Sequence, residues 1–294
     1  MTDPVPIDAE LLNEEGRRLS NDGDVPGAEA AYRAAIAASP EWSVPAYNLG
    51  LLFKYVGRWA ESLHFNELAT RLSPDDEAGW WNLGIAATAL GDWRQARRAW
   101  LACGIRCPDG DGPPDFGWGM TPVRLDPEGD GEVVWARRID PARAKIQSIP
   151  LPTSLFGWQD VVLTDGAAVG HRVVDGHEYS LFDVLARLSA GPARKFIIEL
   201  AEADEDAIDA LEKCALAKDG AAENWGTATH ILCYECSRGV LHQHSGDDGM
   251  PAHPHCGLAA RDHDHARDII ESWLAANSNA DIVRWYEAPE VPGR

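Results

Sequence analysis

The feature that most constrains the fold is a set of residues that recur every 34 positions within the first 110 residues. Two glycine series and one proline series share this interval: Gly16, Gly50 and Gly84; Gly23, Gly57 and Gly91; and Pro40, Pro74 and Pro108. A repeat of this length is one supersecondary unit, which buries its apolar face by stacking on its neighbours. We therefore expect the N-terminal third of the chain to form a stacked array that presents a binding surface.

Each repeat is predicted to contain two helices joined by a short turn. The turns carry Gly with Asp or Arg, at 22–24, 57–58 and 91–92, where one helix ends and the next begins. The predicted helix pairs are 8–21 with 25–39, 43–56 with 59–73, and 77–90 with 93–106.

This pattern resembles the tetratricopeptide repeat (TPR), which has a small residue within the first helix, Gly at the turn and Pro after the second helix. The resemblance covers residues 8–110 as three repeats, 9–42, 43–76 and 77–110. The packing aromatic of the second helix matches at Tyr32 and Trp100, whereas Asn66 departs from the pattern. The resemblance implies a concave groove lined by the first helices. Its implied groove residues are Asn13, Arg17, Tyr47, Asn48, Leu51, Lys54, Trp81, Asn82 and Ile85.

The groove residues indicate the chemistry of a partner. Some TPR proteins hold the C-terminal carboxylate of a peptide with Lys and Arg, but Ala78 and Asn82 stand at the corresponding positions of the third repeat. Aromatic and apolar residues, with Asn48 and Asn82 as amides that pair with backbone, favour an extended or helical apolar segment as ligand. The alternative is that Tyr47 and Trp81 cover the next repeat or the C-terminal domain.

Residues 111–190 are predicted to form a linker and a small β-rich domain. Gly and Pro are dense between 108 and 119, so helix cannot continue. Short β-branched runs at 132–139, 144–149, 160–163 and 169–174 then alternate with turn signals, which predicts a small antiparallel barrel or half-barrel. We predict a short amphipathic helix at 181–188. Residues 132–144 and 160–166 resemble the region that follows the repeats in uncharacterised bacterial TPR proteins, which implies architecture alone.

Residues 191–294 are predicted to form an α+β domain. Strand-like runs at 194–200, 229–234, 257–260 and 282–286 alternate with two amphipathic helices, the first capped by Asp204 and the second beginning at Asp262 or Asp264. The order β-α-β-β-α-β predicts a ferredoxin-like domain. That fold has many functions, so it does not identify one.

Cysteine and histidine concentrate between the second and third predicted strands of this domain. Six of the ten histidines fall between 242 and 265. Two thiolates two residues apart can share one tetrahedral zinc ion, which imidazoles complete. The predicted structural zinc ligands are Cys233, Cys236, His242 and His244, with His253, His255 and Cys256 as alternates. The other interpretations are an unmetallated loop and a redox or catalytic site. Cys103 and Cys107 share a helical face, but Cys103 takes a small packing position of the repeat, which favours burial.

Charge and motifs restrict the classes of function. With 47 acidic and 26 basic residues the formal net charge is −21, which argues against nucleic-acid and anionic-membrane partners. There is no signal-peptide pattern and no apolar run of about 18 residues, so we expect a cytoplasmic protein. Because no nucleophile elbow, phosphate loop or dinucleotide motif is present, we favour a non-enzymatic adaptor. The alternatives are a zinc-dependent hydrolase, with Glu235 as base, and a nucleic-acid-binding module.

Overall fold

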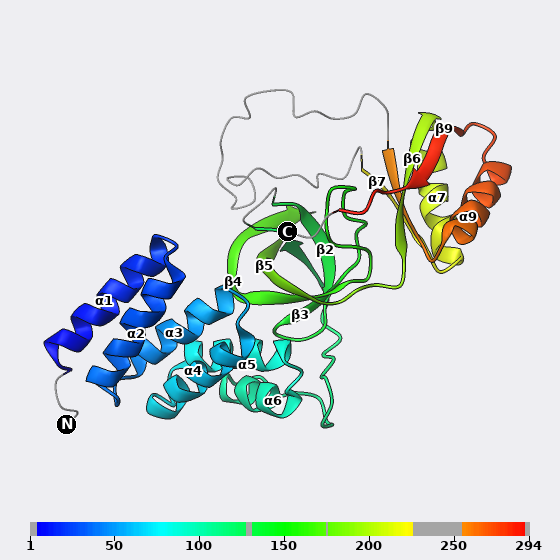
Figure 1. Cartoon of the computed structure of the whole chain (residues 1–294). Helices are drawn as coiled ribbons and strands as arrows, with labels where there is room; N and C mark the ends of the chain where they lie inside the picture. Colours follow the sequence, from blue (N-terminus) through cyan, green and yellow to red (C-terminus); the bar gives the residue numbers. More distant parts are fainter. Residues whose placement is uncertain (1–4, 128–130, 175, 226–254, 292–294) are drawn as a thin grey trace. The chain divides into compact units, whose positions relative to one another are not determined.

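A computed structural model describes residues 5–127, 131–174, 176–225 and 255–291 (Figure 1). The chain divides into two compact units. The first consists of Met1–Gly117 and Ile139–Ala142, and the second of Trp118–Arg138 and Arg143–Arg294. The predicted domains 111–190 and 191–294 both lie in the second unit, apart from 111–117 and 139–142.

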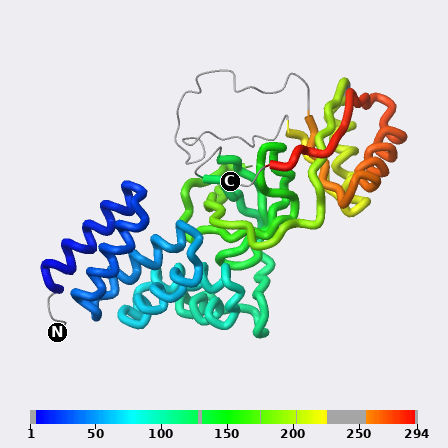
Figure 2. Tube along the Cα trace, viewed as in Figure 1, coloured from blue at the N-terminus to red at the C-terminus, as the bar shows by residue number. Residues whose placement is uncertain are grey.

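The first unit contains six helices arranged as three consecutive pairs, which can be followed along the trace in Figure 2. The prediction of three helical pairs is therefore confirmed. Each turn between paired helices contains a glycine with positive φ, 79° at Gly23, 71° at Gly57 and 69° at Gly91. Glycine adopts this backbone without steric cost, which explains the second glycine series. The helices are α1 (Ile7–Asn21), α2 (Val25–Ala38), α3 (Ser43–Tyr55), α4 (Trp59–Leu72), α5 (Glu77–Ala89) and α6 (Trp93–Ala102).

The first glycine series lies where paired helices approach most closely. A Cβ atom on Gly16, Gly50 or Gly84 would come within 3.0 Å of a side chain of the partner helix, Tyr32, Asn66 or Trp100 respectively. In the first and third repeats an aromatic ring thus lies directly on the backbone of the preceding helix. This contact requires glycine, because any larger residue would displace the ring.

The second repeat solves the same packing problem with polar groups. Asn66 is fully buried, and its Nδ2 donates to the Ser62 carbonyl at 2.8 Å. The Ser62 hydroxyl in turn donates to the Gly50 carbonyl at 2.8 Å. A buried hydrogen-bond network therefore accommodates the Asn66 amide nitrogen, whereas Asn66 Oδ1 is buried without a hydrogen-bond partner among the described residues.

The second unit begins with a closed five-stranded barrel in the order β1-β2-β3-β4-β5. Consecutive strands pair antiparallel, and β1 closes the barrel by pairing parallel with β5, where Val123 lies opposite Phe182 and Arg124 opposite Asp183. Small and branched side chains, such as Val134, Ala144 and Ile146, fill its interior. The strands are β1 (Met120–Arg124), β2 (Val133–Arg138), β3 (Arg143–Ile146), β4 (Val161–Val174) and β5 (His177–Ser189).

The predicted helix at 181–188 is wrong, because Leu181–Leu188 lies within strand β5. Apolar residues at 181, 184, 185 and 188 give a helical spacing in the sequence. The strand nevertheless forms a long antiparallel hairpin with β4, and register shifts between Val161 and Gly170 disturb the alternation that would mark a strand. Tertiary pairing therefore overrides the local pattern.

The described residues that follow the barrel form a four-stranded antiparallel sheet in the order β7-β8-β6-β9. Helices α7 and α9 pack on one face of the sheet (Figure 1), where Trp273 of α9 shares a buried cluster with Phe196 and Ile198 of β6. Within the described residues the element order is β-α-β-β-α-β, but its second strand, β7, is not the one predicted at 229–234. The elements are β6 (Arg194–Glu202), α7 (Glu205–Ala217), β7 (Ala221–Asn224), β8 (His255–Ala260), α9 (His263–Ala276) and β9 (Asp281–Glu287).

Local sequence signals predicted both helices that pack on this sheet, but they did not predict all of its strands. The Asp204 side chain accepts from the Ala207 amide and Asp262 from the His265 amide, as expected for N-caps. Strand β7 was not predicted, since its sequence Ala-Ala-Glu-Asn has little β propensity. The strand predicted at 229–234 lies outside the described residues.

The second face of the sheet packs on the segment that follows β3. Trp225 is buried against Ile149, Ile197 and Ala259, and its indole Nε1 donates to the Ile149 carbonyl at 2.8 Å. The barrel and the sheet are thereby joined through a common apolar cluster within the second unit.

Candidate functional site

The predicted groove residues come from α1, α3 and α5, the first helix of each pair, and several occupy equivalent repeat positions. Asn13, Tyr47 and Trp81 are 34 residues apart, as are Arg17, Leu51 and Ile85. Neighbouring first helices contact one another, so the structure brings these residues together in one series. We call the set the first-helix surface: Asn13, Arg17, Tyr47, Asn48, Leu51, Lys54, Trp81, Asn82 and Ile85.

Exposure divides this surface into two classes. Tyr47, Asn48, Leu51 and Trp81 are partly exposed, and Arg17 is exposed. Ile85 is 0% exposed, Lys54 3%, Asn82 5% and Asn13 7%. The buried residues therefore stabilise the array, and the exposed and partly exposed residues are available to contact a ligand.

Two polar contacts connect the three first helices. Asn48 Nδ2 donates to Asn13 Oδ1 at 2.9 Å, joining α1 to α3. Lys54 Nζ donates to Asn82 Oδ1 at 3.1 Å, joining α3 to α5. The two asparagines predicted to pair with a ligand's backbone therefore also hold adjacent repeats together. Asn48 Oδ1 and Asn82 Nδ2 make no hydrogen bond to the residues that the structure describes.

Cations of this surface are engaged within the array. The Lys54 ammonium lies 4.4 Å from the centre of the Tyr55 ring, a cation–π distance. Arg17 pairs with Glu14 at 3.0 Å on the exposed side of α1. This arrangement differs from a clamp in which cations converge on a ligand carboxylate.

Trp81 has a rigid environment. Its ring packs edge to face on Trp100, with ring centroids 5.4 Å apart. The Trp81 Nε1 atom is buried and has no hydrogen-bond partner in the part of the chain that the structure describes. A large, partly exposed ring held in this way loses little conformational entropy on binding, as is typical of binding hot spots.

The comparisons with known proteins concern this helical unit. No family model matches the chain, and no curated protein matches it. Solved structures similar to it include the second TPR of Spaghetti (RPAP3) bound to an HSP90 peptide, at 18% identity, TM-score 0.32, and coverage of 33% of this chain and 90% of that one. The TPR2B domain of yeast Sti1, in complex with an Hsp70 peptide, gives 20% identity, TM-score 0.32, and coverage of 33% and 78%.

The 34-residue period, the three helix pairs and the glycine-to-ring packing occur together in the first unit. The N-terminal region has the fold of a tetratricopeptide repeat array. The TPR second helices supply the ring or amide that packs on the first helices, which leaves the first-helix surface as the candidate binding site.

The predicted zinc ligands Cys233, Cys236, His242 and His244, and the alternate His253, lie outside the described residues. The alternate Cys256 is fully buried in the core beneath α7 and α9, and burial raises the pKa of its thiol to about 12. A neutral, buried thiol favours a packing role over a ligand role. Within the described ranges, no group of three or more His, Cys, Asp and Glu side chains is placed to hold a metal ion.

The other alternate, His255, belongs to a polar cluster on adjacent strands. Its Nε2 lies 3.8 Å from Glu199 Oε1, which also accepts from Arg284 at 2.6 Å and from the Tyr286 hydroxyl at 3.1 Å. The Arg284 guanidinium holds the pKa of the Glu199 carboxyl below its usual value.

Cys103 is partly buried rather than buried as predicted, and it packs against the cluster of Trp80, Leu83 and Ala99. Its Sγ lies 3.8 Å from the Glu77 carbonyl oxygen, and burial raises the pKa of its thiol to about 11. Burial also raises the pKa of the Cys107 thiol. Neither thiol has the low pKa that is typical of a reactive cysteine.

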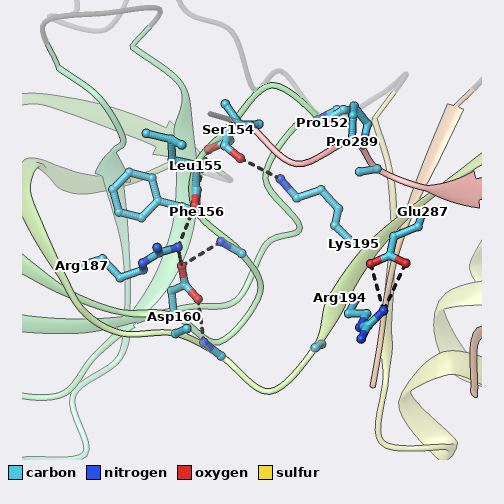
Figure 3. Close-up of a pocket in the computed structure, with 16 residues that line it drawn as sticks. Pro152, Ser154, Leu155, Phe156, Asp160, Arg187, Arg194, Lys195, Glu287 and Pro289 are labelled. Atoms are coloured by element: carbon cyan, nitrogen blue, oxygen red, sulfur yellow. Dashed lines mark hydrogen bonds and ion pairs between the residues drawn. The ribbon is translucent and has the colours of Figure 1, made fainter. Parts of the chain in front are cut away.

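The structure also contains a pocket that sequence reasoning missed. It lies in the second unit, has a volume of about 400 Å³ and is lined by residues from 152–160, 187–195 and 287–291 (Figure 3). We call it the Lys195 pocket. The adjacent Arg194 and Lys195 at the start of β6 were the available signal, but the three segments are too far apart in sequence for their convergence to be read from spacing.

The sequence contains no apolar run long enough to predict a membrane-spanning helix. Among the described residues, no helix combines the length and the apolar character needed to cross a bilayer.

Proposed function

We propose that the TPR array is a protein-interaction module that binds an extended or helical apolar segment of a partner protein through its first-helix surface. The observation that carries the proposal is the partly exposed row of Tyr47, Leu51 and Trp81 on α3 and α5. Aromatic side chains on a rigid scaffold supply most of the binding energy in many interfaces. The unused amide atoms of Asn48 and Asn82 supply polar contacts to the ligand's backbone.

The charge of the surface supports an apolar rather than a carboxylate ligand. Lys54 donates to Asn82, and Arg17 is paired with Glu14. A peptide carboxylate placed on this surface would have to compete with those contacts. An apolar segment instead buries the exposed faces of Tyr47 and Trp81, a gain that does not depend on charge.

The test is the effect of Tyr47→Ala/Trp81→Ala on partner binding. Full-length protein is used to capture partners, and the bound segment is then made as a labelled peptide and titrated by fluorescence anisotropy. Loss of two aromatic anchors, each worth about 2 kcal/mol at a hot spot, weakens binding by tenfold or more. The control is Leu101→Ala, whose side chain is 65% exposed on the second helix α6. Equal affinity of the double variant and the control contradicts the proposal.

We further propose that the C-terminal part is a ferredoxin-like module carrying a structural zinc ion on Cys233, Cys236, His242 and His244. The element order and the antiparallel strand pairing support the first half of this proposal, and the ligand types and their spacing support the second. The array and the module together would make the chain an adaptor with two binding parts.

Zinc analysis of untagged protein tests the metal. We expect close to one zinc per chain in the wild type and loss of the metal in Cys233→Ser/Cys236→Ser, because a tetrahedral site cannot lose two thiolates. Cys256→Ser is the matched control and should keep its zinc, since Cys256 is buried in the sheet core. Metal-free wild-type protein rules out the zinc site.

A further inference from the structure

The walls of the Lys195 pocket are held together by the buried carboxylate of Asp160. Its Oδ1 accepts from the Gly191 amide at 2.7 Å, and its Oδ2 accepts from the Gly157 amide at 2.9 Å. These bonds join the segment before β4 to the turn that precedes β6, and Asp160 is 3% exposed. Asp160 therefore shapes the pocket, with both of its carboxylate oxygens engaged by backbone donors.

The Lys195 side chain ends among backbone carbonyls of this pocket (Figure 3). Its Nζ donates to the carbonyl of Leu151 at 2.6 Å and to that of Ser154 at 3.3 Å. Glu132 acts on this nitrogen at longer range, and the Glu132 carboxylate accepts from the Leu151 amide at 2.8 Å. In the part of the chain that the structure describes, Lys195 thus has two carbonyl acceptors and no ion-pair partner.

These contacts fit a neutral amine better than an ammonium group. An ammonium group has three N–H donors, and the described residues offer it two acceptors, whereas a neutral amine has two N–H donors and a lone pair. Burial lowers the pKa of Lys195 to about 8, although the charges of Glu132 and Asp160 raise it in part. A substantial share of Lys195 side chains is therefore neutral and nucleophilic near pH 8.

The charges around Lys195 favour a neutral ligand over an anion. Each arginine of the lining has a carboxylate beside it, Asp160 for Arg187 at 3.5 Å and Glu287 for Arg194 at 3.3 Å. With one further carboxylate, an uncharged Lys195 leaves one negative charge in excess. This excess favours a ligand that gains positive charge when it reacts. The charged groups that act on Lys195 or line its pocket are Glu132, Asp160, Arg187, Arg194 and Glu287.

Apolar side chains of the lining can contact the body of such a ligand. Leu155 and Phe156 belong to one segment of the lining, and Pro289 and Val291 belong to another. The volume of about 400 Å³ is within the range of small-molecule sites, which combine apolar walls with a few polar groups. The pocket is therefore large enough for a ring or a branched chain beside Lys195.

We propose that Lys195 is a covalent binding site for small apolar aldehydes, which form an imine with its side-chain nitrogen in this pocket. An aldehyde is uncharged, so it does not compete with the paired charges of the lining. Its carbonyl carbon is an electrophile that a lysine amine attacks. The proposal is independent of the TPR surface, since all lining residues belong to the second unit.

Imine formation consumes one aldehyde and releases one water molecule. The Lys195 lone pair forms the C–N bond while the carbonyl π electrons move to oxygen, and a proton passes from nitrogen to that oxygen. In the second step the nitrogen electron pair forms the C=N bond and the C–O bond breaks. The hydroxide leaves with the remaining amine proton as water. A proton from solvent then converts the imine to an iminium cation.

The two hydrogen bonds of Lys195 suit this product because they differ in length. An iminium nitrogen has one N–H, so it keeps one acceptor and gives up the other. The bond to Leu151 is short at 2.6 Å, whereas the contact to Ser154 at 3.3 Å is at the long end of the hydrogen-bond range. Loss of the longer contact should therefore cost little when the imine forms.

Reductive trapping in the full-length protein tests the proposal. Benzaldehyde and sodium cyanoborohydride at pH 7 convert each imine to a stable benzylamine, which peptide mass spectrometry locates. We expect Lys195 to be labelled at least tenfold faster than Lys213, an exposed residue of α7, with a rate that saturates as benzaldehyde increases. The ratio should shrink at pH 10, where exposed amines also lose their protons. The lysines to be followed are Lys54, Lys145, Lys195, Lys213 and Lys218.

Two controls separate binding in the pocket from general amine reactivity. Benzyl alcohol, which has the same ring but no carbonyl, should slow the labelling of Lys195 and leave that of Lys213 unchanged. Leu155→Ala, at a position that is 40% exposed, should keep the fold and raise the half-saturating benzaldehyde concentration about threefold or more. The proposal is overturned if Lys195 is labelled no faster than Lys213 at pH 7, or if its labelling neither saturates nor responds to Leu155→Ala.

Discussion

Trp100→Ala is expected to lower the free energy of unfolding of the TPR array by about 3–5 kcal/mol, the usual range for a buried tryptophan. Trp100 is 0% exposed, lies directly on Gly84 of the paired helix and packs edge to face on Trp81. Its loss leaves a cavity between α5 and α6 that rigid helices cannot fill. Urea unfolding followed by the helical circular dichroism signal measures the effect.

The neighbouring Leu101→Ala is the control for this prediction. Leu101 is 65% exposed on the same helix, so its truncation should change stability by no more than about 0.5 kcal/mol. Gly84→Ala should cost about 1–3 kcal/mol by overpacking in the wild type, and much less in the Trp100→Ala background, where the ring is gone. Equal effects of Trp100→Ala and Leu101→Ala, or additive effects of Gly84→Ala and Trp100→Ala, would contradict the packing described.

Arg124→Met is expected to destabilise the barrel by about 3 kcal/mol, since removing one partner of a buried ion pair leaves the other uncompensated. Arg124 Nε and Nη2 donate to the two carboxylate oxygens of Asp183 at 2.6 and 2.8 Å. The side chains are 6% and 19% exposed, and this pair spans the parallel β1–β5 seam that closes the barrel. Thermal unfolding followed by tryptophan fluorescence measures the loss.

Two further variants distinguish this pair from a surface ion pair. Arg267→Met removes an exposed i,i+3 pair with Asp264, which should cost no more than about 1 kcal/mol. Arg124→Met/Asp183→Leu removes both charges and should recover much of the stability lost in Arg124→Met, because apolar replacements of a buried pair are often tolerated. If Arg124→Met is no more harmful than Arg267→Met, the seam does not depend on this ion pair.

The parts of the fold that follow from local patterns were predictable. The 34-residue period predicted the positions of the three helix pairs, because each glycine series has a structural cause within the repeat. One series allows the close approach of paired helices, and the other supplies the positive φ at each turn. Caps at Asp204 and Asp262 likewise placed α7 and α9. The turns and caps depend on residues a few positions apart, and each contact of the first glycine series joins residues 16 positions apart within one repeat. Sequence pattern is informative over both ranges.

The parts that depend on distant partners were not predictable in the same way. The local sequence of β5 predicts a helix, and its pairing with β4 makes it a strand. The local sequence of β7 does not predict a strand, and its pairing with β8 makes it one. In the candidate site, the equivalent repeat positions of Tyr47 and Trp81 could be identified from the sequence. The burial of Ile85 and the Lys54–Asn82 contact could not, because both depend on how neighbouring repeats pack. The Lys195 pocket could not be predicted, because it is formed by three segments that are separated by up to about 140 residues in the sequence.

The central claim is that a partner segment binds the first helices of the TPR array. Hydrogen–deuterium exchange of the full-length protein, with and without the captured partner peptide, tests it most directly. We predict slower exchange in α3 and α5 around Tyr47 and Trp81, with little change in α2, α4 and α6, and loss of this protection in Tyr47→Ala/Trp81→Ala. Protection confined to the second helices, or protection that persists in the double variant, would contradict the claim.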